Sequence, residues 1–427
     1  MPELLKRAAA PVRVFVAHRD LAGLLGCDLL LGLAFSFASP FMSLFGEHEV
    51  GMDSRAFGLF MTVTSLSGIV ICTLLARASD TRLSRRAVLL LGSGAGALGY
   101  LGYALLRNPV WLALVGSTFL GVAGISFSQL FAQARELLAR SDVPPEDTPL
   151  YMNIFRLFFA LAWTVGPALA SLVVARFSYA GIFVASAICY GSLFVAVVFL
   201  VPARRPTLES RSETSLRQTA RALARGEVLA PFLGFVMIFA CGSMASISLP
   251  LLVVETLGGG SRDVGIVYSV SPFFELPLML FFGAMASKGG GRHSALIRLG
   301  FLLTVVYYAG LSVVRAPWHI YPLQVISAAI TAITQGLSIS FFQDFLPDQA
   351  GTATNLYSNA SSLGRVAGYL LFSQLAAVLA YRGIFLACSG ICLAALALMW
   401  VFRPSGTRRS QGKPRRHGDT EGEATTQ

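Results

Sequence analysis

The sequence contains few charged residues for its length. They make up 13% of its 427 residues, whereas hydrophobic residues make up 55%. Soluble domains carry about 25% charged and about 45–50% apolar residues. A soluble protein of this composition would lack the polar side chains that cover a water-exposed surface. The composition therefore excludes an ordinary soluble domain and indicates a membrane protein.

Strict alternation of apolar and polar residues, the pattern of strands in a membrane barrel, is absent as well. Apolar runs recur instead, each close to the roughly 20 residues that a helix needs to cross a bilayer. They predict an all-α integral membrane protein. Its twelve transmembrane helices are expected at residues 21–45, 56–77, 87–106, 110–133, 150–174, 181–201, 229–254, 264–287, 295–314, 318–342, 353–378 and 383–402.

Catalytic and metal-binding motifs are also missing. The sequence has no HExxH, GxSxG or phosphate-loop motif, and its six cysteines lie inside apolar spans without zinc spacing. The five histidines lie at span ends, in loops or in tails: His18, His48, His293, His319 and His417. We therefore expect no enzyme activity, no metal site and no cofactor.

The formal net charge of +11 would suit a nucleic-acid partner, but its distribution indicates another origin. If both termini are cytoplasmic, 25 of the 33 Lys and Arg residues fall in cytoplasmic segments and 6 in outer loops. This asymmetry is the positive-inside bias that sets the orientation of membrane proteins. It predicts a multi-pass protein with both termini cytoplasmic and with no nucleic-acid partner.

The two halves of the sequence resemble each other. The pattern Gly-x-Ser-x-Ser occurs at 124–128 and at 336–340, an offset of 212 residues, and Asn153 corresponds to Asn355 at an offset of 202. Parallel six-helix repeats are the architecture of major facilitator transporters. The sequence thus predicts two pseudo-symmetric six-helix bundles, the major facilitator fold. The expected parts are an N-terminal half at 1–201, a cytoplasmic linker at 202–228 with an amphipathic helix near 216–223, a C-terminal half at 229–402 and a disordered cytoplasmic tail at 403–427.

Several stretches resemble known transporter motifs. Residues 75–86 resemble the cytoplasmic loop signature of the superfamily without its usual opening glycine, and Trp163-Thr-Val-Gly166-Pro167 resembles the Gly-Pro motif of exporters. Blocks at 129–136, 274–277 and 342–347 resemble the bacterial sugar efflux transporter family. The resemblance implies proton-driven export of small sugars or glycosides across the bacterial cytoplasmic (inner) membrane, with no cofactor. We expect the protein to act as a monomer.

Four ionisable residues stand out inside the predicted spans, away from the span ends: Asp28, Arg156, Glu275 and Arg365. Charged groups at mid-membrane are disfavoured by about 2.5–3.5 kcal/mol, so such residues usually serve a function. Glu275 is predicted to carry the proton, the alternative being a structural pair with Arg365. Asp28 is a second candidate for proton coupling and for substrate binding, or a residue that pairs locally near the membrane rim. Arg156 either binds substrate or extends toward the cytoplasm.

Amide side chains in the spans suit a sugar, because each offers both a donor and an acceptor to vicinal hydroxyls. The only tryptophan away from the predicted interfaces, Trp163, could stack on apolar sugar carbons. The alternative for the amides is hydrogen bonding between helices. The predicted substrate-binding residues are Asp28, Gln129, Asn153, Arg156, Trp163, Gln335, Asn355 and Asn359.

The motif resemblance also implies residues that gate the transport path. They are Asp80, Arg85, Arg86, Gly166, Pro167 and Asp344. Ordinary positive-inside anchoring is the alternative for the arginines.

Two other functions compete with sugar export. Multidrug or small-amphiphile efflux would use an apolar aromatic cavity, which the 31 phenylalanines permit and the embedded amides disfavour. A non-transporting membrane sensor or a membrane-embedded enzyme would need a catalytic set, a metal cluster or an appended soluble domain, and the sequence has no motif for any of them.

Overall fold

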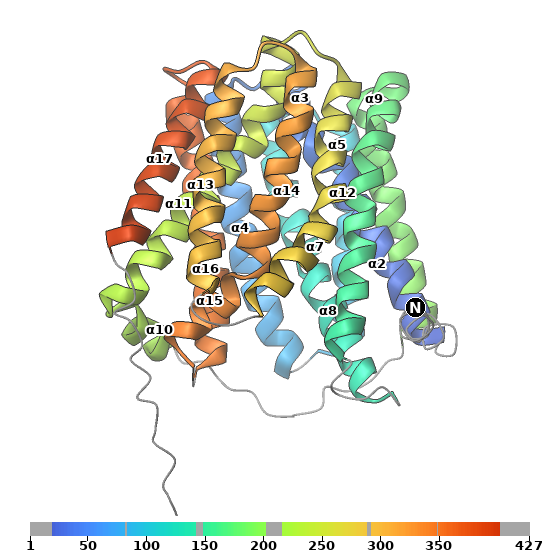
Figure 1. The fold of residues 1–427 in the computed structure, drawn as a ribbon. Coiled ribbons are helices and arrows are strands. Elements are labelled where there is room, and N and C mark those ends of the chain that lie inside the picture. The colour runs from blue at the N-terminus through green and yellow to red at the C-terminus, as the bar shows by residue number, and fades with distance from the viewer. Residues whose placement is uncertain are drawn as a thin grey trace, which may run out of the picture.

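The computed structural model describes residues 19–81, 83–141, 148–201, 216–287, 292–347 and 349–401. Within these ranges the regular structure consists of helices. The long helices stand side by side and run from one end of the molecule to the other (Figure 1). The predicted all-α architecture is confirmed.

The N-terminal half contains six crossings. Its elements are α2 (Arg19–Ala38), η1 (Ser39–Phe41), α3 (Met42–His48), α4 (Ser54–Thr81), α5 (Arg85–Leu105), α6 (Pro109–Val115), η2 (Gly116–Leu120), α7 (Gly121–Ala123), α8 (Ile125–Ala139) and α9 (Thr148–Leu200). A straight helix of the 53 residues of α9 would be about 80 Å long, far more than a bilayer requires. Ser178 interrupts it with a non-helical backbone at φ 58° and ψ −172°, so α9 comprises two predicted crossings.

The C-terminal half follows the short helix α10 (Leu216–Leu223), which forms where the amphipathic linker segment was expected. Its elements are α11 (Gly226–Leu251), η4 (Leu252–Thr256), α12 (Ser261–Ala286), α13 (Arg292–Val313), η5 (Pro317–His319), α14 (Ile320–Gly336), α15 (Ser338–Phe345), α16 (Ala350–Leu375) and α17 (Tyr381–Val401). Both η2 and η4 are π-helical turns that continue the helices before them.

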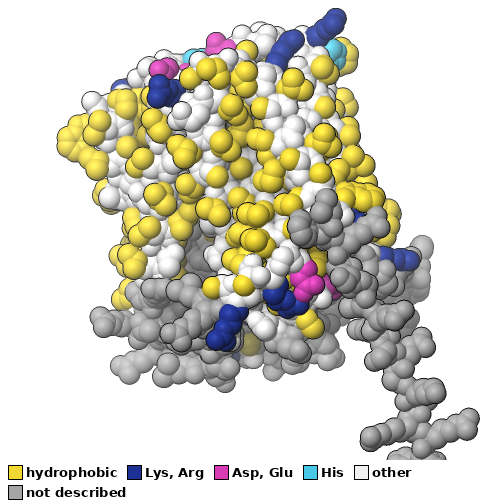
Figure 2. Space-filling model, turned by 90° about the vertical axis from the view of Figure 1, so that its left-hand side faces the viewer, with side chains coloured by type: hydrophobic (Ala, Val, Ile, Leu, Met, Phe, Trp, Pro, Cys, Tyr) yellow, Lys and Arg dark blue, Asp and Glu magenta, His cyan; other side chains and the backbone are white. Residues whose placement is uncertain are grey.

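Ten helical stretches are long and apolar enough to cross a membrane. The interrupted α9 accounts for two of the predicted spans, and α16, which carries Asn355, Asn359 and Arg365, corresponds to the span predicted at 353–378. Each of the twelve predicted spans therefore has a helical counterpart. On the face shown in Figure 2, hydrophobic side chains cover the middle, and the visible charged side chains lie near the two ends. This distribution matches a bilayer around the middle of the bundle.

The two ends of the bundle differ in how the halves meet. We call them the α3 end and the α10 end, after the short helices that lie there (Figure 1). Among the described residues, the hydrogen bonds and ion pairs found between the halves all lie at the α3 end. They join His48 to Glu255, Ser54 to Tyr381, Glu47 to Tyr381, the Arg55 carbonyl to Ser373 and the Ser171 carbonyl to Ser261.

Two glycines bring the halves into close contact near this end. A Cβ placed on Gly58 of α4 would lie 2.7 Å from Ser373 Cβ and 2.8 Å from Ser373 Cα on α16. A Cβ on Gly265 of α12 would lie 2.7 Å from Ser171 Cβ and 2.8 Å from the Pro167 carbonyl oxygen on α9. Because real Cβ atoms do not approach other atoms so closely, the halves reach this packing only with glycine at both positions.

We expect Gly58→Ala to open the α3 end, since the added methyl group meets backbone atoms that cannot rotate away. The measurement is the distance between spin labels on Ala56→Cys and Val378→Cys, two exposed positions near this end of opposite halves. Gly283→Ala is the matched control, because nothing lies within 4 Å of its added Cβ. The distance distribution should lengthen in Gly58→Ala and stay unchanged in the control. An unchanged distribution in both would show that this contact does not hold the end shut.

Candidate functional site

A cavity of about 780 Å³ lies between the two halves. Ligand pockets for small molecules typically enclose about 300–1,000 Å³. The N-terminal half contributes residues of α8 and α9 to its wall, and the C-terminal half contributes residues of α11, α12, α13, α14, α15 and α16. The cavity therefore has the size and the two-sided construction of a small-molecule site.

The wall from the N-terminal half is largely aromatic. Phe127 and Phe131 on α8 and Phe159 and Trp163 on α9 line the cavity. The Phe127 ring centroid lies 4.7 Å from that of Phe131 and 5.0 Å from that of Phe159. Such mutually packed rings form a rigid apolar surface, suited to the C–H face of a ring-shaped ligand.

The wall from the C-terminal half combines hydroxyl and amide groups with apolar side chains such as Ile238, Leu249 and Met279. Gln324 on α14 donates a hydrogen bond from Nε2 to Tyr307 Oη on α13 at 3.2 Å. Tyr268 Oη on α12 donates to the Ser246 carbonyl oxygen on α11 at 3.2 Å. Further hydroxyl groups line the same wall, from Ser271, Thr304, Tyr308, Ser327, Thr331, Thr334 and Tyr357. Thr304 and Thr334 donate to carbonyl groups of their own helices, and the hydroxyl and amide groups together provide donors and acceptors for a polyhydroxylated ligand.

Opposite charges line opposite walls. Arg156 lies on α9, and Glu275 lies near the middle of α12 between Pro272 and Pro277. Each proline lacks the N–H that would bond to the carbonyl four residues earlier, so the carbonyl groups of Tyr268 and Phe273 have no intrahelical partner in the stretch of α12 that precedes Glu275. Among the described residues, Glu275 forms no ion pair with Arg365.

The predicted substrate-binding residues divide into two groups. Arg156, Trp163 and Gln335 line the cavity, as does the proposed proton carrier Glu275. The remaining five do not line it: Asp28, Gln129, Asn153, Asn355 and Asn359. Their burial differs, since Asn153 and Asn359 are exposed and Gln129 is buried.

Asp28 on α2 lies in an unusual environment. Its side chain is fully buried, and neither carboxylate oxygen has a hydrogen-bond partner among the described residues. It does not line the cavity, so a role in substrate contact would require a rearrangement of α2.

Three of the predicted gating residues make polar contacts at the α10 end. At the α10 end, Arg85 Nε lies 3.0 Å from Glu136 Oε2, and Asp344 Oδ2 lies 2.8 Å from His293 Nδ1. Arg86 donates to the Val198 carbonyl oxygen at 2.6 Å. Each of these contacts joins two residues of the same half.

The remaining gating residues lie elsewhere. Gly166 packs against Ser36 of α2, and the Pro167 carbonyl faces Gly265 across the halves. The side chain of Asp80 lies outside the described residues.

Sequence reasoning did not identify the polar wall of the C-terminal half. Gln324 is an intramembrane amide, and the criterion applied to the other amides would have included it. Tyr268, Tyr307 and Tyr308 gave no such signal, because tyrosine is also common at helix ends near the membrane surface. Whether these tyrosines face the cavity depends on how each helix is rotated about its own axis, and the pattern of apolar residues in the sequence does not specify that rotation.

Comparisons with known proteins agree with this architecture. The family model described as Major Facilitator Superfamily matches residues 24–369 and 231–423. A protein of Deinococcus radiodurans whose name places it among the sugar efflux transporters is 35% identical, covering 89% of this chain and 97% of the relative. Sugar efflux transporter A of Dickeya chrysanthemi is 28% identical, covering 88% of this chain and 93% of the relative.

A solved structure is similar as well. The nucleoside transporter NupG superposes with a TM-score of 0.77 at 12% identity, covering 90% of this chain and 99% of that one, which establishes the fold alone. The twelve crossings, the cavity between the halves and the family match lead to one conclusion. The chain belongs to the major facilitator superfamily, and within it to the sugar efflux transporters, and is a multi-pass membrane transporter of small molecules rather than an enzyme.

Proposed function

We propose that this transporter exports small sugars or glycosides by proton antiport with alternating access. The observation that carries the proposal is the cavity between the halves, which has one aromatic wall and one wall where hydroxyl and amide groups lie among apolar side chains. A sugar presents both an apolar C–H face and a rim of hydroxyl groups, so it complements both walls. The names of the relatives support the same substrate class.

The contacts between the halves support alternating access. The halves meet through polar contacts at the α3 end, whereas the ion pairs described at the α10 end stay within one half. We infer from this difference that the cavity opens toward the α10 end. Basic residues at that end, such as Arg85, Arg140 and Arg225, agree with a cytoplasmic location under the positive-inside bias. On this orientation the structure is the inward-facing state of a protein of the bacterial inner membrane with both termini cytoplasmic.

Glu275 is the proposed proton carrier. It is the one acidic residue among those described that line the cavity. A carboxylate in a cavity that faces each side in turn can take up a proton from one side and release it on the other. Arg156 cannot lose its proton, so on this proposal it serves as a fixed charge that binds substrate oxygens.

We expect Glu275→Gln to abolish proton-driven uptake of labelled glycosides into everted membrane vesicles, because glutamine cannot exchange a proton. Sugar exchange without a proton gradient should persist, since the amide keeps the shape and polarity of the site. Glu227→Gln is the control, because Glu227 pairs with Arg225 outside the cavity. Uptake that still responds to the gradient in Glu275→Gln would exclude this residue as the carrier.

The polar wall leads to a second test of substrate class. We expect Gln324→Leu to raise the KM for sugar about three- to tenfold, since one hydrogen bond contributes about 0.5–1.5 kcal/mol net. The exposed Gln374→Leu should leave KM unchanged. Efflux of a cationic dye is measured in parallel. If Gln324→Leu leaves sugar KM unchanged while the dye is exported, multidrug efflux is the better account.

A further inference from the structure

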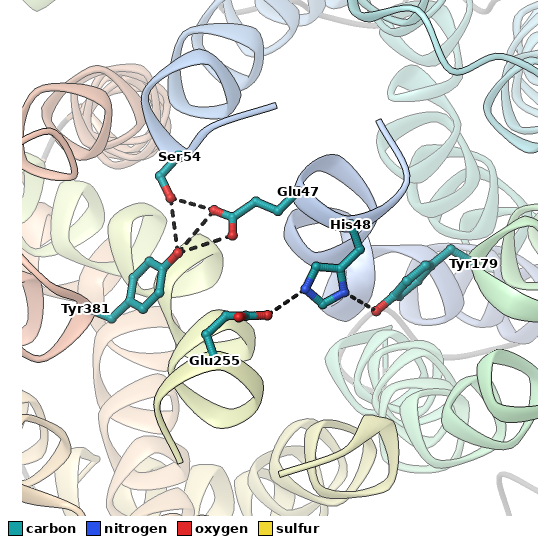
Figure 3. Close-up of polar contacts among 6 residues, drawn as sticks. All are labelled: Glu47, His48, Ser54, Tyr179, Glu255 and Tyr381. Atoms are coloured by element: carbon teal, nitrogen blue, oxygen red, sulfur yellow. Dashed lines mark hydrogen bonds and ion pairs between the residues drawn. The ribbon is translucent and has the colours of Figure 1, made fainter. Parts of the chain in front are cut away.

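The polar contacts at the α3 end form a cluster built from five elements. This α3-end cluster consists of Glu47 and His48 on α3, Ser54 on α4, Tyr179 on α9, Glu255 on η4 and Tyr381 on α17 (Figure 3). It has two arms. In the first, Glu47 accepts hydrogen bonds from Ser54 at 2.5 Å and from Tyr381 at 3.2 Å. In the second, His48 lies between Glu255 and Tyr179 (Figure 3).

His48 is bonded through both ring nitrogens. Its Nε2 lies 2.6 Å from Glu255 Oε1, and its Nδ1 lies 3.3 Å from Tyr179 Oη. A neutral imidazole donates through one nitrogen and accepts through the other, whereas the charged ring donates through both. The hydroxyl of Tyr179 can act as donor or acceptor, so the site accommodates both forms. Only the charged form makes an ion pair with Glu255 in the opposite half.

Water reaches this pair. The side chains of His48 and Glu255 are 37% and 42% exposed, respectively. Histidine is the side-chain type that changes charge between about pH 5 and 8. A proton from the solution at the α3 end therefore has access to the imidazole without crossing the cavity.

The surroundings of His48 carry an excess of negative charge. Glu47 precedes it on α3, Glu49 follows it directly after the end of α3, and Glu255 faces it from η4. Arg107 neutralises one of these carboxylates, since its Nη2 lies 2.7 Å from Glu49 Oε2. Closing the α3 end brings Glu255 toward Glu47, and a positive charge on His48 offsets their repulsion.

Other charged groups at this end are engaged differently. Asp53 accepts from the Ala56 N–H at the start of α4, and Asp263 accepts from Tyr321 on α14. Arg55 and Arg382 form no ion pair among the described residues. Within the part of the chain that the structure describes, the imidazole of His48 is therefore the titratable cation between the halves.

We propose that His48 is a proton-binding site whose occupancy favours closure of the α3 end. The inference rests on the proposed antiport cycle. In that cycle a proton binds from outside and must favour the return to the inward-facing state. A proton on His48 does so, because its ion pair with Glu255 exists only when the halves meet at this end. The site acts in addition to Glu275 and lies outside the substrate cavity.

The test measures how often the α3 end opens at two external pH values. The reporter is Gly242→Cys, which lines the cavity and has no atom within 4 Å of its added Cβ. Arg262→Cys, an exposed position at the start of α12, is the reference. A charged, membrane-impermeant thiol reagent is added outside intact cells at about pH 5.5 and about pH 7.5. Dividing reporter labelling by reference labelling removes the pH dependence of thiol reactivity.

We expect the ratio to be about two- to fivefold higher at the higher pH, the effect of one partly exposed ion pair. In His48→Gln the ratio should be high and independent of pH, because the amide bonds to Glu255 without gaining charge. In His48→Arg, which is charged throughout, it should be low and independent of pH. His319→Gln is the control and should keep the wild-type response, because His319 lies outside the cluster and bonds to the Arg315 N–H.

A pH response that persists in His48→Gln would overturn the proposal, as would a high ratio in His48→Arg. Sugar export is measured in the same cells. If the wild-type protein exports sugar but its labelling ratio does not change with pH, the role of His48 is wrong and the proposed function stands. A normal labelling response without any sugar export would instead count against the proposed substrate.

Discussion

Hydrocarbon cannot satisfy a hydrogen-bond donor or acceptor, and this constraint favours positions between helices for the polar side chains of the bundle. Leucines such as Leu280 and Leu386 can face lipid, and they are 72% and 62% exposed. The amide of Gln324 and the hydroxyl of Tyr307 face each other between helices instead. Because polar groups of the C-terminal half and Arg156 of the N-terminal half gather where the halves meet, the bundle acquires a cavity between them that combines polar and aromatic side chains. The position of the transport site thus follows from the surrounding lipid, which disfavours polar side chains on the outer surface of the bundle.

A transporter must close that cavity at one end without making closure permanent. At the α3 end, Gly58 and Gly265 allow backbone contact between the halves. Close packing of this kind supplies many weak contacts that are lost together once the halves move apart. The polar contacts beside it, from His48 to Glu255 and from Glu47 to Tyr381, are partly exposed. Partly exposed pairs contribute little net stability, which suits a contact that must form and break in every cycle.

The fold could be predicted because a helix that crosses lipid needs a continuous run of apolar residues, and such a run is visible in the sequence without knowledge of its neighbours. Arg156 and Glu275 were predicted as functional residues because they are charged and lie inside spans, and both line the cavity. The cavity position of the other residues depends on helix rotation, so Asp28 was selected by the same criterion and lies outside the cavity. The pair of His48 and Glu255 joins residues 207 positions apart. Each looks like an ordinary residue at a span end, and only the packing of the halves brings them together.

Protons at Glu275 and at His48 would act on the same equilibrium in different ways. A bound proton shifts two conformations only to the extent that its affinity differs between them. The ion pair of His48 spans both halves, so opening the α3 end removes the partner and lowers the affinity directly. Glu275 has no such partner across the halves among the described residues, and its affinity must change with the water and substrate that surround it. Coupling at Glu275 therefore depends on what occupies the cavity, whereas coupling at His48 depends on whether the halves touch.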